Sequence, residues 1–321
     1  MVKKIIIDTD PGVDDSMAIF YALNSPEIEV LGLTTIFGNA STDICTENAL
    51  RLLEIADRTD IPVHKGAEKP LKSEHRGPGD FVHGKDGQGN SDLRPPESTV
   101  QRETAVEYLH NIIKKNPGEI TLVPIGPLTN IAELLLYDKS IANDIKEIVL
   151  MGGNAISEGN ATPTAEANII NDAESADIVF SANCEISMVG LDVTHKVFMS
   201  KEEIESLGQS SDPRSSHLKK ILPFYLEFCS NFLGKEGMPI HDSSAITYVL
   251  DRSMFKTLSY PIKVETLGIS RGKTWMGIGI SDNEGGLGER TKPWENRRNV
   301  NVCVDVDSAK AIRLILERLS Y

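Results

Sequence analysis

Short runs of apolar, mostly β-branched residues recur along the chain, and each ends at Gly, Pro, Asn or Asp. Runs of this length and composition are typical of strands that are buried on both faces of a sheet. They predict strands at residues 3–7, 30–36, 119–124, 146–151 and 186–191.

The segments between these runs carry apolar residues at helical spacing, with polar residues on the opposite face. They predict helices at residues 14–23, 42–57, 104–115, 128–137 and 173–182. Strands that alternate with helices favour an α/β fold with an open, mainly parallel central sheet flanked by helices. Functional sites of such folds lie at the carboxyl ends of the strands.

The remaining segments follow less regular patterns. Residues 65–97 are polar and rich in Gly and Pro, which predicts a long loop, and long loops in compact domains are usually functional or disordered. Residues 200–233 have a helical pattern, and residues 260–305 return to strands with turn signals at 270–272 and 283–288. A final helix is predicted at 308–319. Because no repeat or linker stands out, we expect residues 1–321 to form a single domain.

Composition narrows the class of protein. Hydrophobic residues make up 40% of the 321 residues and charged residues 25%, as in an ordinary folded domain. No apolar run approaches the roughly 18 residues of a membrane span, and no signal-like segment opens the chain, so we expect a cytoplasmic protein. The four cysteines are far apart and predict free thiols. A net charge of −14 argues against nucleic acid and suits a cation or a neutral small molecule.

Candidate chemistry concentrates in the stretch IIIDTDPGVDDSMA, where four carboxylates surround a Pro-Gly turn: Asp8, Asp10, Asp14 and Asp15. Strand alternation predicts that the first two leave the strand on the same side. The last two open a helix, where the dipole favours negative charge and a carboxylate can cap the free amides. A cap accounts for one or two of the four. The other interpretation is a hard-cation site, because Ca²⁺ takes about six to eight oxygen ligands.

A different enzyme class also uses two aspartates at the end of its first strand. In a haloacid-dehalogenase-like phosphatase, Asp8 would attack phosphorus while Mg²⁺ is held nearby. Against this alternative, Gly12 stands where that class usually has Thr or Val, and no later strand offers the expected pair of aspartates. An EF-hand is excluded, because the ligand spacing and the Glu at its last position are absent.

Further motifs follow in order along nearly the whole chain. DTDPGVDD occupies residues 8–15, TTIFGN ends at Asn39, and HGKDGQG begins at His83. They are followed by VPIGPLTNIA at 123–132, MGGN from Met151, GNATPTAEANIIND at 159–172 and HDSSAI from His241. Together these motifs resemble those of the nucleoside hydrolases of the inosine-uridine-preferring type. The resemblance implies an open α/β fold, one bound Ca²⁺, a homo-oligomer (dimer or tetramer), and hydrolysis of ribonucleosides to ribose and free base in purine and pyrimidine salvage.

The resemblance also implies roles for individual residues. Calcium would be held by the carboxylates of Asp10, Asp15 and Asp242 and by the main-chain carbonyl of Ile125. The ribose hydroxyls would contact Asp14, Asn39, Asn160, Glu166, Asn168 and Asp242. Asp10 would also take a proton from calcium-bound water, and His241 would protonate the leaving base.

Some assignments stay open at this point. His83 is either an exposed loop residue or a group that reaches the base when its loop closes. Tyr225 falls at helical spacing and either packs in the core or lines the base pocket. A non-enzymatic alternative is a nucleoside- or ribose-binding protein without turnover, which no feature of the sequence favours.

The chemistry fits the implied roles. Cleavage of the bond from C1′ to nitrogen builds oxocarbenium character on the sugar and negative charge on the base. Carboxylates stabilise that cation, and a metal lowers the pKa of water enough for a carboxylate to deprotonate it. Direct attack by water predicts inversion at C1′. The vicinal 2′- and 3′-hydroxyls can replace two waters on calcium, which would orient the sugar.

Overall fold

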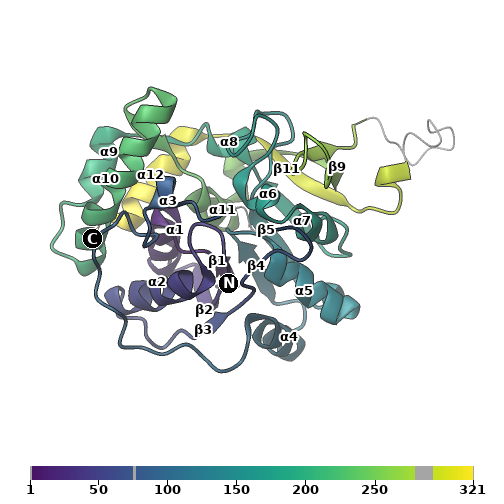
Figure 1. Cartoon of the computed structure of the whole chain (residues 1–321), viewed down its shortest axis with the longest axis horizontal. Coiled ribbons are helices and arrows are strands. Elements are labelled where there is room, and N and C mark those ends of the chain that lie inside the picture. Colours follow the sequence, from purple (N-terminus) through teal and green to yellow (C-terminus); the bar gives the residue numbers. More distant parts are fainter. Residues whose placement is uncertain (1, 75–76, 279–291, 321) are drawn as a thin grey trace.

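A nine-stranded sheet forms the centre of the computed structural model, which describes residues 2–74, 77–278 and 292–320 (Figure 1). The strand order is β10-β9-β11-β6-β5-β4-β1-β2-β3. The strands are β1 (Lys3–Thr9), β2 (Ile28–Thr35), β3 (Val63–Lys65), β4 (Ile120–Pro124), β5 (Glu147–Met151), β6 (Ile186–Val189), β9 (Phe255–Val264), β10 (Thr274–Met276) and β11 (Asn299–Val306). All neighbours pair in parallel except β9, which is antiparallel to both β10 and β11.

The strand order reverses at β1. From β1 the chain moves outward to β2 and β3, and then returns to the other side of β1 with β4. In open α/β sheets, the crevice at such a reversal lies outside the carboxyl ends of the two strands. The segments that follow β1 and β4 therefore frame the expected site.

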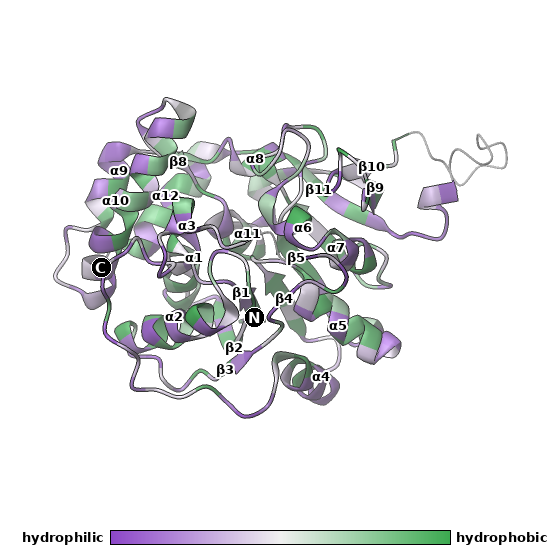
Figure 2. Ribbon diagram, viewed as in Figure 1, coloured by the Kyte–Doolittle hydropathy of each residue, from purple (hydrophilic) through white to green (hydrophobic). Residues whose placement is uncertain are grey.

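Helices cover both faces of the sheet. One face carries α1 (Val13–Leu23), α2 (Thr42–Ile55), α10 (Pro213–Leu233), α11 (Asp242–Leu250) and α12 (Ser308–Leu319). The other face carries α4 (Ala105–Lys115), α5 (Thr129–Tyr137) and α7 (Ala173–Val179). Alternate residues of β1 supply the two cores, because Ile5 and Ile7 pack on the first face and Ile6 on the second. Figure 2 shows the hydrophobic strands between helices with polar outer surfaces.

Short elements connect these layers. The short helices are α3 (Asp80–His83), α6 (Ala167–Asn171), α8 (Leu191–Thr194) and α9 (Lys201–Leu207). Single 3₁₀ turns lie at Lys139–Asn143, Arg252–Met254 and Lys292–Trp294. A two-stranded antiparallel sheet pairs β7 (Phe198–Ser200) with β8 (Gly237–Pro239). Among the described residues, no helix is long and apolar enough to cross a membrane, and the four cysteines are buried free thiols.

The predicted fold class is confirmed, and the differences lie at the ends of elements and in short ones. The strand predicted at 186–191 stops at Val189, because Gly190 turns the chain into α8. The helices predicted at 42–57 and 173–182 end at Ile55 and Val179. The segment 200–233 is two helices, α9 and α10, and the predicted loop 65–97 contains α3. The turn signals at 283–288 lie outside the described residues.

Several elements had no predicted counterpart. β3 and α6 are only three and five residues long, which is too short for a periodic pattern. α11 is buried along most of its length, so it lacks the polar face that marks an amphipathic helix. β9 does overlap the strand region predicted at 260–305, but it begins five residues earlier, at Phe255.

Candidate active site

The turn between β1 and α1 places two aspartates at the start of a helix. Gly12 is the N-cap of α1, and its amide donates to Asp15 Oδ2 at 2.9 Å. Thr9 Oγ1 donates to the other oxygen of the same carboxylate at 2.6 Å. Asp15 therefore does part of the capping that the sequence suggested, although as the third helical residue and not as the N-cap. Asp14 precedes it and is also buried.

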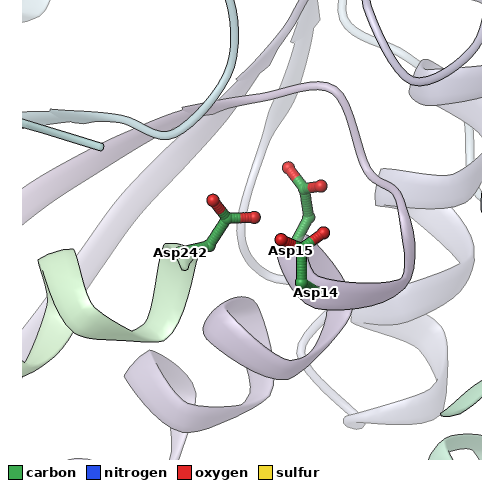
Figure 3. A group of neighbouring side chains, drawn as sticks. All are labelled: Asp14, Asp15 and Asp242. Carbon is green, nitrogen blue, oxygen red and sulfur yellow. The ribbon is translucent and has the colours of Figure 1, made fainter. Parts of the chain in front are cut away.

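Asp242 joins these two aspartates from a distant part of the chain. It is the first residue of α11, and its carboxylate faces Asp14 and Asp15 across the gap between the two helix starts (Figure 3). One oxygen of each of the three lies within 4.8 Å of the others. Packing between α1 and α11 thus brings together residues that are more than two hundred positions apart in the sequence.

The buried carboxylates repel one another. Burial and the charge of Asp15 raise the pKa of Asp14 to about 7. Burial and the charges of Asp14, Asp15, Asp10 and Glu166 raise the pKa of Asp242 well above its usual range. A bound cation would remove this repulsion, and oxygen ligands in this arrangement suit a hard divalent ion.

Asp10 lies beside this group at the end of β1. Its Oδ2 accepts a hydrogen bond from the Asn39 amide at 2.8 Å, and the Asn39 side chain donates to Asp15 Oδ2 at 2.9 Å. Asp10 Oδ1 is buried and has no hydrogen-bond partner among the described residues. Burial and the neighbouring Asp15 charge raise the pKa of Asp10 well above its usual range. We call Asp10, Asp14, Asp15 and Asp242 the carboxylate side of the site.

Two glycines make room for Asp10. A Cβ on Gly38 would lie 2.0 Å from Asp10 Oδ2, and a Cβ on Gly126 would lie 2.4 Å from Asp10 Oδ1. Both distances are far below van der Waals contact, so any side chain at either position would displace the carboxylate. Neither glycine had a predicted role, although each follows the end of a strand.

Asp8 is separate from the other aspartates. Thr34 Oγ1 and Asn130 Nδ2 donate to its Oδ1 at 2.5 and 2.7 Å, and the side chain is buried. Burial raises its pKa to about 7, with Glu133 as the charged neighbour. The resemblance gives Asp8 no role at the cation or the sugar, and its side chain is held apart from the other aspartates by Thr34 of β2 and Asn130 of α5. The other oxygen of Asp8, Oδ2, is buried and has no hydrogen-bond partner among the described residues.

Three predicted sugar-binding residues meet at the start of α6. Glu166 is the N-cap of this helix, and its Oε2 accepts from the Gly153 amide at 3.0 Å. Asn160 Oδ1 accepts from the Ala167 amide at 3.0 Å, although Asn160 itself is exposed. Asn168 lies in the first turn of the helix. The helix start therefore holds the amide and carboxylate groups of this loop in one place.

Asn168 connects this loop to the end of β4. Its Nδ2 donates to the Ile125 carbonyl at 2.8 Å and to the Met151 carbonyl at 3.2 Å. Ile125 follows β4 directly and precedes Gly126, which packs against Asp10. The predicted carbonyl ligand thus lies between Asn168 and the carboxylate side.

His83 and Tyr225 lie next to the turn between β1 and α1. His83 is buried, and its Nδ1 accepts from the Val13 amide at 3.2 Å and lies 3.8 Å from Asp14 Oδ1. Its ring stacks on Tyr225 of α10, with centroids 5.5 Å apart and planes 19° apart. Burial lowers the pKa of His83 to about 3, and burial and the aspartate charges raise that of Tyr225. The prediction that His83 is an exposed loop residue is therefore wrong.

His241 immediately precedes Asp242 and is buried. Its Nδ1 lies 2.8 Å from Thr194 Oγ1 of α8, and its ring meets the ring of His195 edge-on at 5.7 Å. Burial and the neighbouring His195 and His83 lower the pKa of His241 to about 3, so the imidazole is neutral near pH 7. We call His83 and His241 the histidine side of the site. Thr194 was not predicted, since a threonine in a four-residue helix gives no pattern.

Known proteins resemble this chain over its full length. Residues 5–313 match the family model of the inosine-uridine preferring nucleoside hydrolases. The probable uridine nucleosidase 2 of Arabidopsis thaliana is 42% identical over 318 residues, which cover 99% of this chain and 97% of that protein. The pyrimidine-specific ribonucleoside hydrolase RihA of Salmonella arizonae is 38% identical, with 100% and 99% covered. A solved plant nucleoside hydrolase, the PpNRh1 enzyme, has a TM-score of 0.94 at 37% identity, with 100% and 99% covered.

Proposed function

The chain belongs to the inosine-uridine preferring nucleoside hydrolase family and is an enzyme that hydrolyses ribonucleosides, and we propose that it acts on uridine with the help of one calcium ion. Two relatives support the choice of base. The Arabidopsis thaliana protein is named a uridine nucleosidase and the Salmonella arizonae protein a pyrimidine-specific hydrolase. Each is similar to this chain over nearly its whole length, which supports a pyrimidine nucleoside as the substrate.

The residues present fit a divalent cation. Asp10 Oδ1 is a buried carboxylate oxygen without a partner among the described residues, and the surrounding carboxylates raise one another's pKa. We assign the ion to the carboxylates of Asp10, Asp15 and Asp242 with the carbonyl of Ile125. When bound, calcium would offset the repulsion, acidify water and orient a vicinal diol.

In the proposed reaction Asp10 is the general base. It accepts one proton from the water that attacks C1′ as the bond from C1′ to the base nitrogen breaks. Asp10 Oδ1 has no hydrogen-bond partner among the described residues, so this oxygen is free to accept the proton. The water oxygen becomes the new hydroxyl of ribose, and the electron pair of the broken bond leaves with the base.

The sugar would be held by hydroxyl contacts on two sides. Asp14 and Asn39 would bind it from the β1–α1 turn and the segment after β2. Asn160, Glu166 and Asn168 would bind it from the start of α6. Because Asn168 Nδ2 already donates to two main-chain carbonyls, its Oδ1 is the atom left to accept from a hydroxyl.

The leaving base would lie between the two histidines. If Thr194 Oγ1 donates to Nδ1 of His241, the ring proton is on Nε2, which can then donate to the base. The Val13 amide fixes the same tautomer for His83, because Nδ1 accepts there. Tyr225, stacked on His83, would close the pocket on that side.

The observation that carries the proposal is the convergence of Asp14, Asp15 and Asp242, all buried, with oxygens within 4.8 Å. The test is release of reducing sugar from uridine, cytidine, inosine, adenosine and guanosine, with and without prior removal of metal by a chelator. We expect fastest release from uridine, and loss of release after chelation that added calcium restores. Equal rates on all five would overturn the preference for uridine. Binding without release would make the chain a nucleoside-binding protein.

A further inference from the structure

The loop that carries His83 is joined to the aspartate turn at a second point by Gln88. Gln88 is 1% exposed, although its neighbours in the loop are largely polar. Burial of an amide side chain is costly unless its hydrogen bonds are satisfied. The positions of the hydrogen-bond partners of Gln88 therefore show which segment its side chain holds in place.

The amide nitrogen of Gln88 faces main-chain carbonyls of the turn. Nε2 lies 3.0 Å from the Gly12 carbonyl and 3.3 Å from the Pro11 carbonyl. It also lies 3.0 Å from Ser16 Oγ, which itself donates to the Gly12 carbonyl at 2.6 Å. These two carbonyls belong to the residues between Asp10 and Asp14, so contacts that fix them restrict the backbone from which both carboxylates project.

The amide oxygen of Gln88 is held from α10. His217 Nε2 lies 2.8 Å from Gln88 Oε1, and because an amide oxygen only accepts, Nε2 must carry the ring proton. His217 is buried and packs edge-on against Phe20 of α1, at a centroid distance of 5.9 Å. The side-chain amide is thus fixed at both ends, with its nitrogen directed at the turn.

Asn48 of α2 reinforces the same arrangement. Its Nδ2 donates to the Pro11 carbonyl at 3.0 Å and to the Asp86 carbonyl at 2.8 Å. Asp86 Oδ1 in turn accepts from the main-chain N–H of Gln88 at 2.8 Å, which shapes the loop. Two amide side chains therefore converge on the turn, and one of them comes from the loop that also supplies His83.

From these contacts, and on the basis of the function proposed above, we propose that Gln88 is a positioning residue that holds the Pro11-Gly12 turn, so that Asp10 and Asp14 face the cation and the sugar. It touches neither ligand in this role. Groups that orient metal ligands from outside the first layer typically change metal affinity or activity by about 10–100-fold. A displacement of about 1 Å at the reacting groups has an effect of similar size.

The test replaces Gln88 with Met, which keeps the length of the side chain and removes both hydrogen-bonding groups. We expect Gln88→Met to lower kcat/KM for uridine and to weaken calcium binding in titration calorimetry, each by about 10–100-fold. The matched control is Thr121→Val, because Thr121 Oγ1 makes a buried hydrogen bond to Glu147 at 3.0 Å near the start of β4, far from the strand end. That variant should lose stability and retain wild-type affinity and rate.

Gln88→Asn covers the case in which the Met variant does not fold. Its amide is one methylene shorter and cannot reach both carbonyls, so rate and calcium affinity should fall in the same direction. If a folded Gln88 variant matches the wild type in both while its melting temperature falls as in Thr121→Val, Gln88 is structural only and the inference is overturned. Calcium titration needs no nucleoside, so it decides the role of Gln88 even if the wild type cleaves none of the nucleosides and the proposed function fails.

Discussion

The carboxylate side and the histidine side of the site are both buried, and burial acts on them in opposite directions. It raises the pKa of the aspartates, whose charged forms are then unstable without a cation. It lowers the pKa of His83 and His241 to about 3, so that they are neutral. This difference shows how two sides of one pocket can have different roles in the reaction. One side collects negative charge for a cation and a cationic transition state, and the other offers neutral donors to a leaving base.

The largest effect is expected from removing the base on the carboxylate side. Asp10→Asn keeps the acceptor for the Asn39 amide and removes the proton acceptor, so kcat for uridine should fall by at least about 10³-fold. Asp8→Asn is the matched control, because Asp8 is a buried aspartate of β1 that lies outside the carboxylate side. Turnover by Asp10→Asn at near the wild-type rate, or a larger loss in Asp8→Asn, would show that the wrong aspartate has been given the role.

The next effect tests the space around the same carboxylate. Gly126→Ala places a methyl group against Asp10 Oδ1, so the carboxylate must move, and we expect kcat to fall by about 10²-fold. Circular dichroism should still show a folded chain. The control is Gly118→Ala, which makes the same glycine-to-alanine change at a position with open space around it. The positive φ of 72° at Gly118 means that this control loses some stability. Full activity in Gly126→Ala would contradict the placement of Asp10.

A smaller and more selective effect is expected on the histidine side. His241→Ala should slow uridine by about 10²-fold but leave p-nitrophenyl riboside much less affected, because its leaving group needs no proton. Rates on both substrates give the comparison directly. Equal losses on the two would place His241 in binding or in support of Asp242, and the division between the sides would fail.

The smallest effect is a shift in stability with pH. The pKa of Asp14 rises from 3.8 to about 7 on folding, so the folded chain holds this proton more tightly than the unfolded chain. Without a cation, stability from this group is present at low pH and is lost as pH rises toward about 7. Calcium needs the ionised carboxylates, so its gain in Tm should be larger by a few degrees at about pH 8 than at about pH 5. Thermal unfolding with calcium and with chelator measures it, and equal gains at both pH values would contradict the charge balance.

The sequence predicts the sheet well, because buried parallel strands carry their β-branched pattern locally. It predicts less about residues whose role depends on contacts between distant segments of the chain. Asp8 and Asp10 look equivalent in the motif, yet hydrogen bonds from Thr34 and Asn130 turn Asp8 away. Thr194 belongs to none of the motifs, and Gln88 lies in HGKDGQG but had no predicted role, because the contacts of both arise only once α8, α10 and the turn are packed together.

The most direct test of the account is a titration of calcium into metal-free protein, followed by binding heat and by the rate of ribose release from uridine in the same samples. The account predicts that one ion binds per chain and that the rate of ribose release and the binding heat reach half of their final values at the same calcium concentration. In Asp242→Asn, neither the rate nor the heat should follow the wild-type curve. Full rate before any calcium is bound, or binding without any gain in rate, would contradict the claim that the carboxylate side works by holding a cation.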